Sequence, residues 1–143
     1  MIDFTVDTEI ARQPGDVFAY VSDPGNLSNW QTNTVSAVTE TGGPVGVGTR
    51  IREVHSAPGG KELESLVEVS EYEPGRVFAL QVLEGTPIHA RITFEPIEPG
   101  TVMHFRAYGQ LERLMRLASP ILGRMLQRQF TDDCARLKAL LES

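Results

Sequence analysis

The sequence is poor in features that would place it in a specialised class of protein. It has one cysteine, Cys134, so an internal disulfide is impossible and a reducing compartment is favoured. No apolar run approaches the ~20 residues that a membrane-spanning helix needs. The first residues, MIDFTVDTEI, lack the basic and apolar segments of a secretory signal. We therefore expect a cytoplasmic protein without stable insertion in a membrane.

Basic residues are also scarce, with 13 Lys and Arg against 19 Asp and Glu and a formal net charge of −6. This balance argues against nucleic acid as a partner, because binding a phosphate backbone requires positive charge. The sequence contains no HExxH or HxxxH metal spacing, P-loop, dinucleotide-binding fingerprint or Ser-His-Asp arrangement. Cys134 follows two aspartates, which disfavour its thiolate, so we expect a packed residue and not a nucleophile. Neither a metal nor another cofactor is expected.

What the sequence does contain is regular alternation of apolar and polar residues. A chain of 143 residues, 41% of them hydrophobic, is expected to form one domain over 1–143. Residues 2–11 alternate as a half-buried strand does, and two short helical turns follow, at Pro14 and between Asn26 and Trp30. Six more strands are predicted at residues 33–41, 49–56, 61–72, 76–83, 87–96 and 101–109. The sequence thus predicts an α+β protein with an antiparallel sheet of about seven strands, apolar on one face and solvated on the other.

A long amphipathic helix closes the chain, from Leu111 to about Leu141. Its apolar positions recur at steps of mostly three and four, at Leu111, Leu114, Met115, Ala118, Ile121, Leu122, Met125, Phe130, Leu137 and Leu140. Ser119 is a suitable N-cap and Pro120 suits the first helical position, so we expect the helix to divide there. The division predicts that residues 111–118 form a movable flap, while Phe130, Leu137 and Leu140 anchor the helix on the sheet.

Several local motifs occur in a familiar order. They are PGDVFAYVSDPGNLSNW at 14–30, GVGT at 46–49, YEPGR at 72–76, GT at 100–101 and PILGRMLQRQFTDDCARLKALLE at 120–142. Through these motifs the chain resembles the SRPBCC superfamily, which includes START and birch-pollen-allergen proteins, and most closely its small bacterial polyketide-cyclase/dehydrase-like members. The resemblance implies a helix-grip fold, in which a curved antiparallel sheet wraps around the long helix. It also implies a hydrophobic cavity between them, which in relatives holds lipids, sterols, polyketides or hormones.

Glu53 and His55 form the most informative candidate site. On the strand at 49–56 they share a face with Ile51, because side chains alternate along a strand. If Ile51 faces the cavity, a carboxylate and an imidazole face it too. Such a pair either acts as an acid/base couple or orients the polar end of a ligand. The alternative is a bulge or the opposite phase, which would leave both side chains solvated at the rim.

The other residues expected to line the cavity come from the sheet and the helices. They are Trp30, Ile51, Leu63, Ser65, Val67, Phe78, Leu80, Ile92, Phe94, Met103, Phe105, Met115, Leu122 and Met125. The same apolar side chains would equally fill a packed core. For Trp30 and Ser65 we favour this alternative, with Trp30 packing the short helices on the sheet and Ser65 acting as a small filler. His89 and His104 alternate with inward-facing apolar residues, so we expect both outside.

Three functions remain open on these grounds. The first is binding of a small hydrophobic molecule, lipid-like or polyketide-like, between the sheet and the helix. The second is an enzyme of the cyclase/dehydrase type, which would need at least two titratable groups converging inside the cavity. The third is a protein-interaction module with a filled cavity, as a monomer or a homodimer. The strand phases place only Glu53 and His55 inside, which favours binding.

Overall fold

A computed structural model describes residues 1–110 and 119–143. It contains a seven-stranded antiparallel sheet with the strand order β1-β7-β6-β5-β4-β3-β2. The strands are β1 (Ile2–Ile10), β2 (Thr34–Thr39), β3 (Arg50–Ala57), β4 (Lys61–Glu73), β5 (Val77–Glu84), β6 (Ile88–Pro96) and β7 (Thr101–Gly109). The helices are α1 (Pro14–Val21), the 3-10 turn η1 (Pro24–Asn26), α2 (Leu27–Trp30), the 3-10 turn η2 (Pro58–Gly60) and α4 (Ser119–Glu142). Every predicted strand is present.

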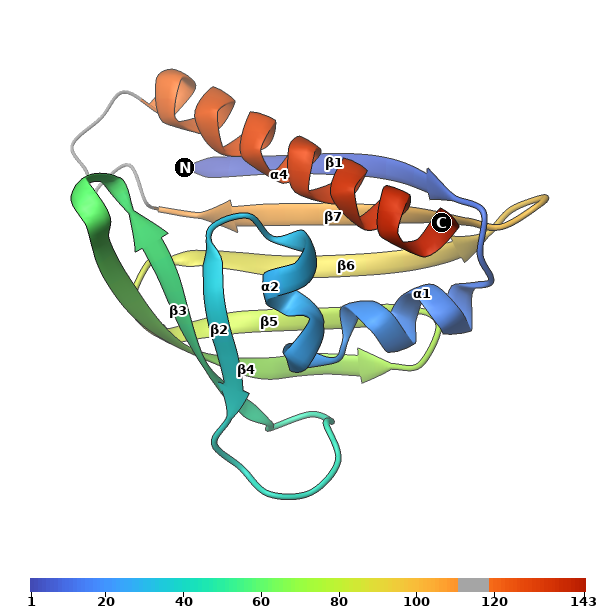
Figure 1. The fold of residues 1–143 in the computed structure, drawn as a ribbon, viewed down its shortest axis with the longest axis horizontal. Helices are drawn as coiled ribbons and strands as arrows, with labels where there is room; N and C mark the ends of the chain where they lie inside the picture. Colours follow the sequence, from blue (N-terminus) through green and yellow to red (C-terminus); the bar gives the residue numbers. More distant parts are fainter. Residues whose placement is uncertain (111–118) are drawn as a thin grey trace.

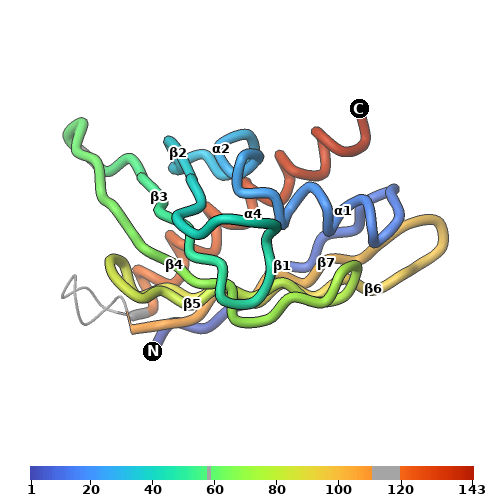
Figure 2. Tube along the Cα trace, turned by 90° about the horizontal axis from the view of Figure 1, so that it is seen from below, coloured from blue at the N-terminus to red at the C-terminus, as the bar shows by residue number. Residues whose placement is uncertain are grey.

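The helices α1, α2 and α4 cover one face of the sheet, which confirms the predicted helix-grip architecture. Figure 1 shows α4 running diagonally over β1 and β7, while α1 and α2 lie beside it over the middle of the sheet. The view in Figure 2 shows α1 and α2 on one side of β4–β7, with β2 and β3 curving up beside α2. In contacts, α4 packs chiefly on β1 and touches α2, and α1 packs on β6.

The sheet divides its side chains between an apolar inner face and a charged outer face. On β7, Met103, Phe105 and Ala107 are buried, and the residues between them are partly accessible. On the outer face, Arg106 pairs with Asp3 at 2.7 Å, and similar cross-strand pairs occur along the sheet. Exposed ion pairs of this kind stabilise a protein only slightly. Their position shows that the solvent-exposed face of the sheet is the one that the alternation predicted.

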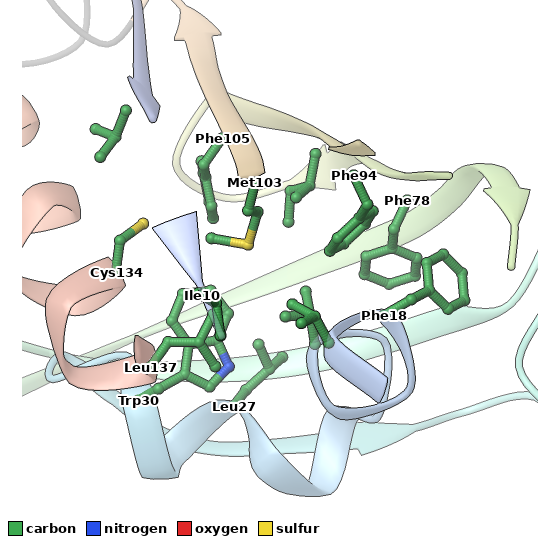
Figure 3. Close-up of a cluster of buried hydrophobic side chains, with 14 of the residues drawn as sticks. Ile10, Phe18, Leu27, Trp30, Phe78, Phe94, Met103, Phe105, Cys134 and Leu137 are labelled. Carbon is green, nitrogen blue, oxygen red and sulfur yellow. The ribbon is translucent and has the colours of Figure 1, made fainter. Parts of the chain in front are cut away.

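One end of the inner face is filled by aromatic side chains. Phe18 of α1 packs edge-on against Tyr72, Phe78 and Phe94, with ring centroids 5.2, 6.1 and 5.4 Å away. Figure 3 shows Phe18 beside Phe78 and Phe94 in this cluster. Trp30 of α2 is fully buried and meets Phe105 edge-on at 6.1 Å. This half of the molecule is therefore a packed core.

The face that α4 turns to the sheet differs from the predicted one. Leu122, Cys134, Leu137 and Leu141 are buried, and Leu126 and Phe130 are partly buried. Three residues of the predicted apolar face, Ile121, Met125 and Leu140, are exposed instead. We call the inward-facing residues Leu122, Leu126, Phe130, Leu137 and Leu141 the inner row. Each exposed residue directly precedes a member of this row, and one residue corresponds to a rotation of about 100° around the helix. The prediction was wrong for these three because it merged two neighbouring rows of apolar residues.

The C-terminal half of α4 is held to the β1 edge of the sheet by hydrogen bonds as well as by apolar packing. Lys138 Nζ donates to the carbonyl of Glu9 at 2.6 Å, and the Arg12 guanidinium donates to the carbonyl of Leu141 at 3.0 Å. Leu137 anchors this half as predicted, but Leu141 takes the role expected of Leu140. The predicted flap at 111–118 lies outside the described residues.

Cys134 is buried between α4 and the sheet, as predicted. Burial raises the pKa of its thiol to about 12, and the neighbouring Asp133 carboxyl adds to the rise. A thiol with so high a pKa forms little thiolate at neutral pH and is a poor nucleophile.

His104 lies on the outer face as predicted, and it joins three strands. Its Nδ1 lies 2.6 Å from Asp7 Oδ1 on β1, and its Nε2 lies 3.2 Å from Glu95 Oε2 on β6. The bond to Asp7 is the largest of the effects that raise the pKa of His104 above its usual 6.5. The protonated imidazole therefore stabilises the folded sheet.

We predict that His104→Gln lowers stability by up to about 1 kcal/mol in acid and by little in alkali. A raised pKa in the folded state means that the stabilisation is complete below the unfolded pKa and is lost as pH rises through the folded value. Urea unfolding at about pH 5.5 and about pH 9 would measure the difference between variant and wild type. An equal loss at both pH values would contradict the account.

Candidate functional site

A cavity of about 230 Å³ lies between the sheet and the middle of α4. Its floor is formed by β3, β4, β5 and β6, and its roof by residues of α4 between Leu126 and Asp133. Apolar side chains dominate one part of the wall, including Leu80, Val82, Ile88 and Phe130. Since the aromatic core fills the end of the sheet under α1, the space is confined to the end that α1 does not reach.

The cavity lies where β5 and β6 separate. Their ladder covers only Val77–Leu80 on β5, so Val82, which pairs with Val67 of β4, has no partner on β6. The Val82 N–H donates instead to His89 Nδ1 at 3.0 Å. His89 was predicted to face outward, and its ring does pack on Tyr108 of the outer face, with centroids 5.4 Å apart. At the gap between the strands it also contributes to the cavity wall, which the alternation did not predict.

Glu53 and His55 lie in the wall on the predicted face of β3. Glu53 is 7% exposed, Ile51 beside it is buried, and both side chains of the pair line the cavity. Glu53 Oε1 lies 3.0 Å from His55 Nε2. The alternative of two solvated side chains at the rim is therefore excluded for Glu53, and the two groups form one polar unit in close contact.

Gln31, which precedes β2, and Thr34, the first residue of β2, extend this unit. His55 Nδ1 lies 3.4 Å from Thr34 Oγ1, and the Thr34 hydroxyl donates to Gln31 Oε1 at 3.0 Å. The pairing of β2 with β3 shifts register between Thr34 and Ser36, and this irregularity places Thr34 opposite His55. The sequence offered no signal for it, since a bulge shows itself only when the partner strand is known.

The polar side chains of this unit are close enough to exchange a proton. Thr34 donates its hydroxyl hydrogen to Gln31 Oε1, and its oxygen lies 3.4 Å from His55 Nδ1. Glu53 Oε1 and His55 Nε2 lie 3.0 Å apart in the cavity wall. A carboxyl group and an imidazole at this separation have the minimum equipment for general acid/base chemistry.

Asp133 of α4 is the important wall residue that the sequence analysis missed. It is 1% exposed and lines the cavity. Its Oδ1 accepts hydrogen bonds from the Thr32 backbone N–H at 3.1 Å and the Thr32 hydroxyl at 3.0 Å. Its Oδ2 is buried without a hydrogen-bond partner in the described part of the chain. Burial raises the pKa of this carboxyl.

The sequence did carry a signal for Asp133. The inner row of α4 runs through Leu126, Phe130 and Leu137, and Asp133 stands three residues after one and four before the next. An aspartate in an inward-facing row is unusual, because an unpaired buried carboxylate is costly. The adjacent Asp132 is exposed, so the two neighbouring aspartates differ in burial.

The structure brings together part of the predicted ligand-binding set. The cavity wall contains Glu53, His55, Leu63, Ser65, Val67, Leu80 and Phe105. The packed core takes Trp30, Ile51, Phe78, Ile92, Phe94 and Met103 instead, because α1 and α2 fill that end of the sheet. Leu122 packs on Ile2, and Met125 is 61% exposed, so neither meets the cavity. Met115 lies outside the described residues.

Among residues 1–110 and 119–143, no cluster of three or more His, Cys, Asp or Glu side chains has an arrangement suited to a metal ion. Within the same ranges, each helix is too short or too polar to reach across a bilayer.

The fold is shared with many solved structures. Protein CV1439 from Chromobacterium violaceum matches with a TM-score of 0.77 and 16% identity over 100% of this chain and 99% of that one. TTHA0849 from Thermus thermophilus matches with a TM-score of 0.76 and 19% identity over 96% and 94% of the two chains. The di-domain aromatase/cyclase StfQ of the steffimycin biosynthetic pathway matches with a TM-score of 0.77 and 15% identity, over 99% of this chain and 50% of that protein. At these identities the likeness establishes the fold.

These structures define the class as helix-grip proteins. The chain belongs to the family described as polyketide cyclase / dehydrase and lipid transport, whose sequence model matches residues 1–142. The match confirms the SRPBCC-type resemblance over almost the whole chain. None of the curated proteins matches the sequence.

We predict that Asp133→Asn becomes more stable relative to wild type as pH rises. Since burial raises the folded-state pKa of Asp133, wild type is favoured when the carboxyl is protonated and loses that advantage as pH rises through the folded value. The amide keeps an oxygen to accept from Thr32. Chemical denaturation between about pH 4 and about pH 8 measures this trend.

The control is Asp132→Asn, which removes the same charge from an exposed neighbour on α4. Its stability difference from wild type should change little over this range. A stability difference for Asp133→Asn that becomes less favourable with rising pH would contradict the account, since it would mean that the ionised carboxylate is stabilised in the folded state.

Proposed function

We propose that the chain binds a small, mainly apolar molecule in the cavity between the sheet and α4, with the polar end of the ligand at Glu53 and His55. The observation that supports the proposal most strongly is that the cavity lies at one end of the inner face of the sheet, under the middle of α4. Aromatic packing closes the other end, whereas about 230 Å³ remains open beside apolar walls and a group of polar side chains. An open cavity favours ligand binding over an interaction module with a filled one.

The size of the cavity limits the ligand. An apolar cavity of about 150 Å³ holds benzene, so about 230 Å³ suits a molecule of roughly a dozen non-hydrogen atoms, such as a two-ring compound. Burial of the ligand supplies about 25 cal/mol for each Å² of apolar surface removed from water. The family description, which includes lipid transport, supports an apolar ligand.

We predict that Ala90→Phe weakens binding of the neutral fluorescent probe 2-naphthalenemethanol by at least about tenfold, or 1.4 kcal/mol. Ala90 lines the cavity opposite Leu80 on β5, and a phenyl ring there occupies the space that the probe needs. The control Ala139→Phe adds the same group at an exposed position of α4 and should bind as wild type does. Fluorescence titration measures the dissociation constants, and circular dichroism checks the fold.

Equal affinities in the two variants, or no binding by wild type, would count against a ligand site in this cavity.

A second candidate, an enzyme of the cyclase/dehydrase type, gains support from the polar side of the wall. The strand phases predicted only Glu53 and His55 inside, but Asp133 and His89 also line the cavity. In dehydration of a β-hydroxy ketone, a base takes the proton from the carbon between the two functional groups. The hydroxyl then leaves as water after accepting a proton, and a carbon–carbon double bond forms. The Glu53–His55 pair can take one proton and return it.

We predict for this candidate that wild type accelerates dehydration of 4-hydroxy-4-phenylbutan-2-one, and that Glu53→Gln or His55→Asn slows the catalysed rate by about 100-fold or more. Ultraviolet absorbance of the conjugated product measures the rate. Glu62→Gln, an exposed position on the neighbouring strand β4, is the control and should react as wild type does. Undiminished turnover in both variants of the pair would exclude its participation, and no acceleration by wild type would leave binding alone.

A further inference from the structure

The described wall of the cavity contains acidic side chains but no lysine or arginine. Glu53 and Asp133 contribute two carboxyl groups, and no lysine or arginine is among the described residues of the wall. Several arginines of the sheet, such as Arg91 and Arg106, point to the outer face and pair there with acidic residues. A ligand that enters the cavity therefore meets acidic groups and, among the residues that the structure describes, no lysine or arginine.

The two imidazoles do not reverse this balance. His89 Nδ1 accepts a hydrogen bond from the Val82 N–H, so this nitrogen carries no hydrogen and the ring is neutral. His55 lies 3.0 Å from Glu53, so a charge on its ring at most balances that one carboxylate. Asp133 remains without an ion-pair partner in the described part of the chain.

Asp133 also has an unused hydrogen-bonding position. Thr32 satisfies Oδ1 with two hydrogen bonds, whereas Oδ2 is buried and receives none from the described residues. A buried acceptor without a donor costs free energy that a ligand with a donor can restore. A positively charged donor adds attraction to the carboxylate, and charge-assisted bonds are about twice as strong as neutral ones.

Resting on the function proposed above, we propose that the cavity selects a small apolar amine, whose protonated nitrogen is held on the side of the wall formed by Asp133 and Glu53. A fatty acid or another organic anion of the same size is rejected, because its charge would meet two carboxyl groups and no arginine or lysine of the described wall. An uncharged alcohol binds with intermediate affinity, since it supplies a donor without the charge.

Three probes with the same ring system test the selection: 2-naphthalenemethylamine, 2-naphthalenemethanol and 2-naphthoate, titrated into the intact chain at pH 7 by calorimetry. We expect the amine to bind at least about tenfold more tightly than the carboxylate, with the alcohol between them. A carboxylate that binds as tightly as the amine, or an amine that binds no better than the alcohol, overturns the proposal.

The variants locate the selection. In Asp133→Asn the amine should lose its advantage over the alcohol by several-fold, whereas Asp132→Asn, with the same change of charge on the exposed side of α4, should keep it. An amine preference that survives in Asp133→Asn overturns the role of Asp133. The wild-type series stands even if that variant folds poorly.

The two proposals fail in different ways. If none of the three probes binds, the proposed function itself fails. If the alcohol binds and Ala90→Phe prevents it, but the amine has no advantage, the ligand site stands and the selection of amines does not.

Discussion

The attachment of the C-terminal half of α4 to β1 is the constraint on which the rest of the structure depends. Cys134, Leu137 and Leu141 are buried there, and Lys138 donates a hydrogen bond to the carbonyl of Glu9. Figure 1 shows α4 crossing the strands at an angle, with its first turns beside the start of β1 and its last turns over β7. Leu122 in the first turns packs on Ile2, and the residues between Leu126 and Asp133 in the middle of the helix form the roof of the cavity.

The contents of the cavity follow from the same geometry. Phe130 closes the apolar side by packing against Phe4 and Phe105, at centroid distances of 5.7 and 5.2 Å. One turn later, Asp133 continues the same inner row, so a carboxyl group enters the wall that also contains Glu53 and His55 of β3. The site thus combines an apolar volume with acidic groups, and this combination underlies both the proposed ligand and the alternative proton-transfer chemistry.

Most of the fold was predictable because strand alternation and turn residues are local signals. The phase of β3, which puts Glu53 and His55 beside Ile51, was correct for the same reason. The errors arose where the answer depends on distant parts of the chain. His89 contributes to the cavity wall because β5 and β6 separate, and Met125 is turned outward because the packing of Leu137 and Leu141 sets the rotation of α4. Volumes left between packed elements are likewise absent from residue patterns, so the core could not be distinguished from the cavity wall.

The central claim is that a ligand occupies one end of the inner face while the other end is closed. Intermolecular nuclear Overhauser effects between 2-naphthalenemethanol and methyl-labelled protein measure this directly. The account predicts contacts from the probe to the methyl groups of Leu80, Val82 and Leu126, and none to Val17 or Val21 of α1. Contacts to the methyl groups of α1, or binding without contacts to those of the cavity, would contradict it.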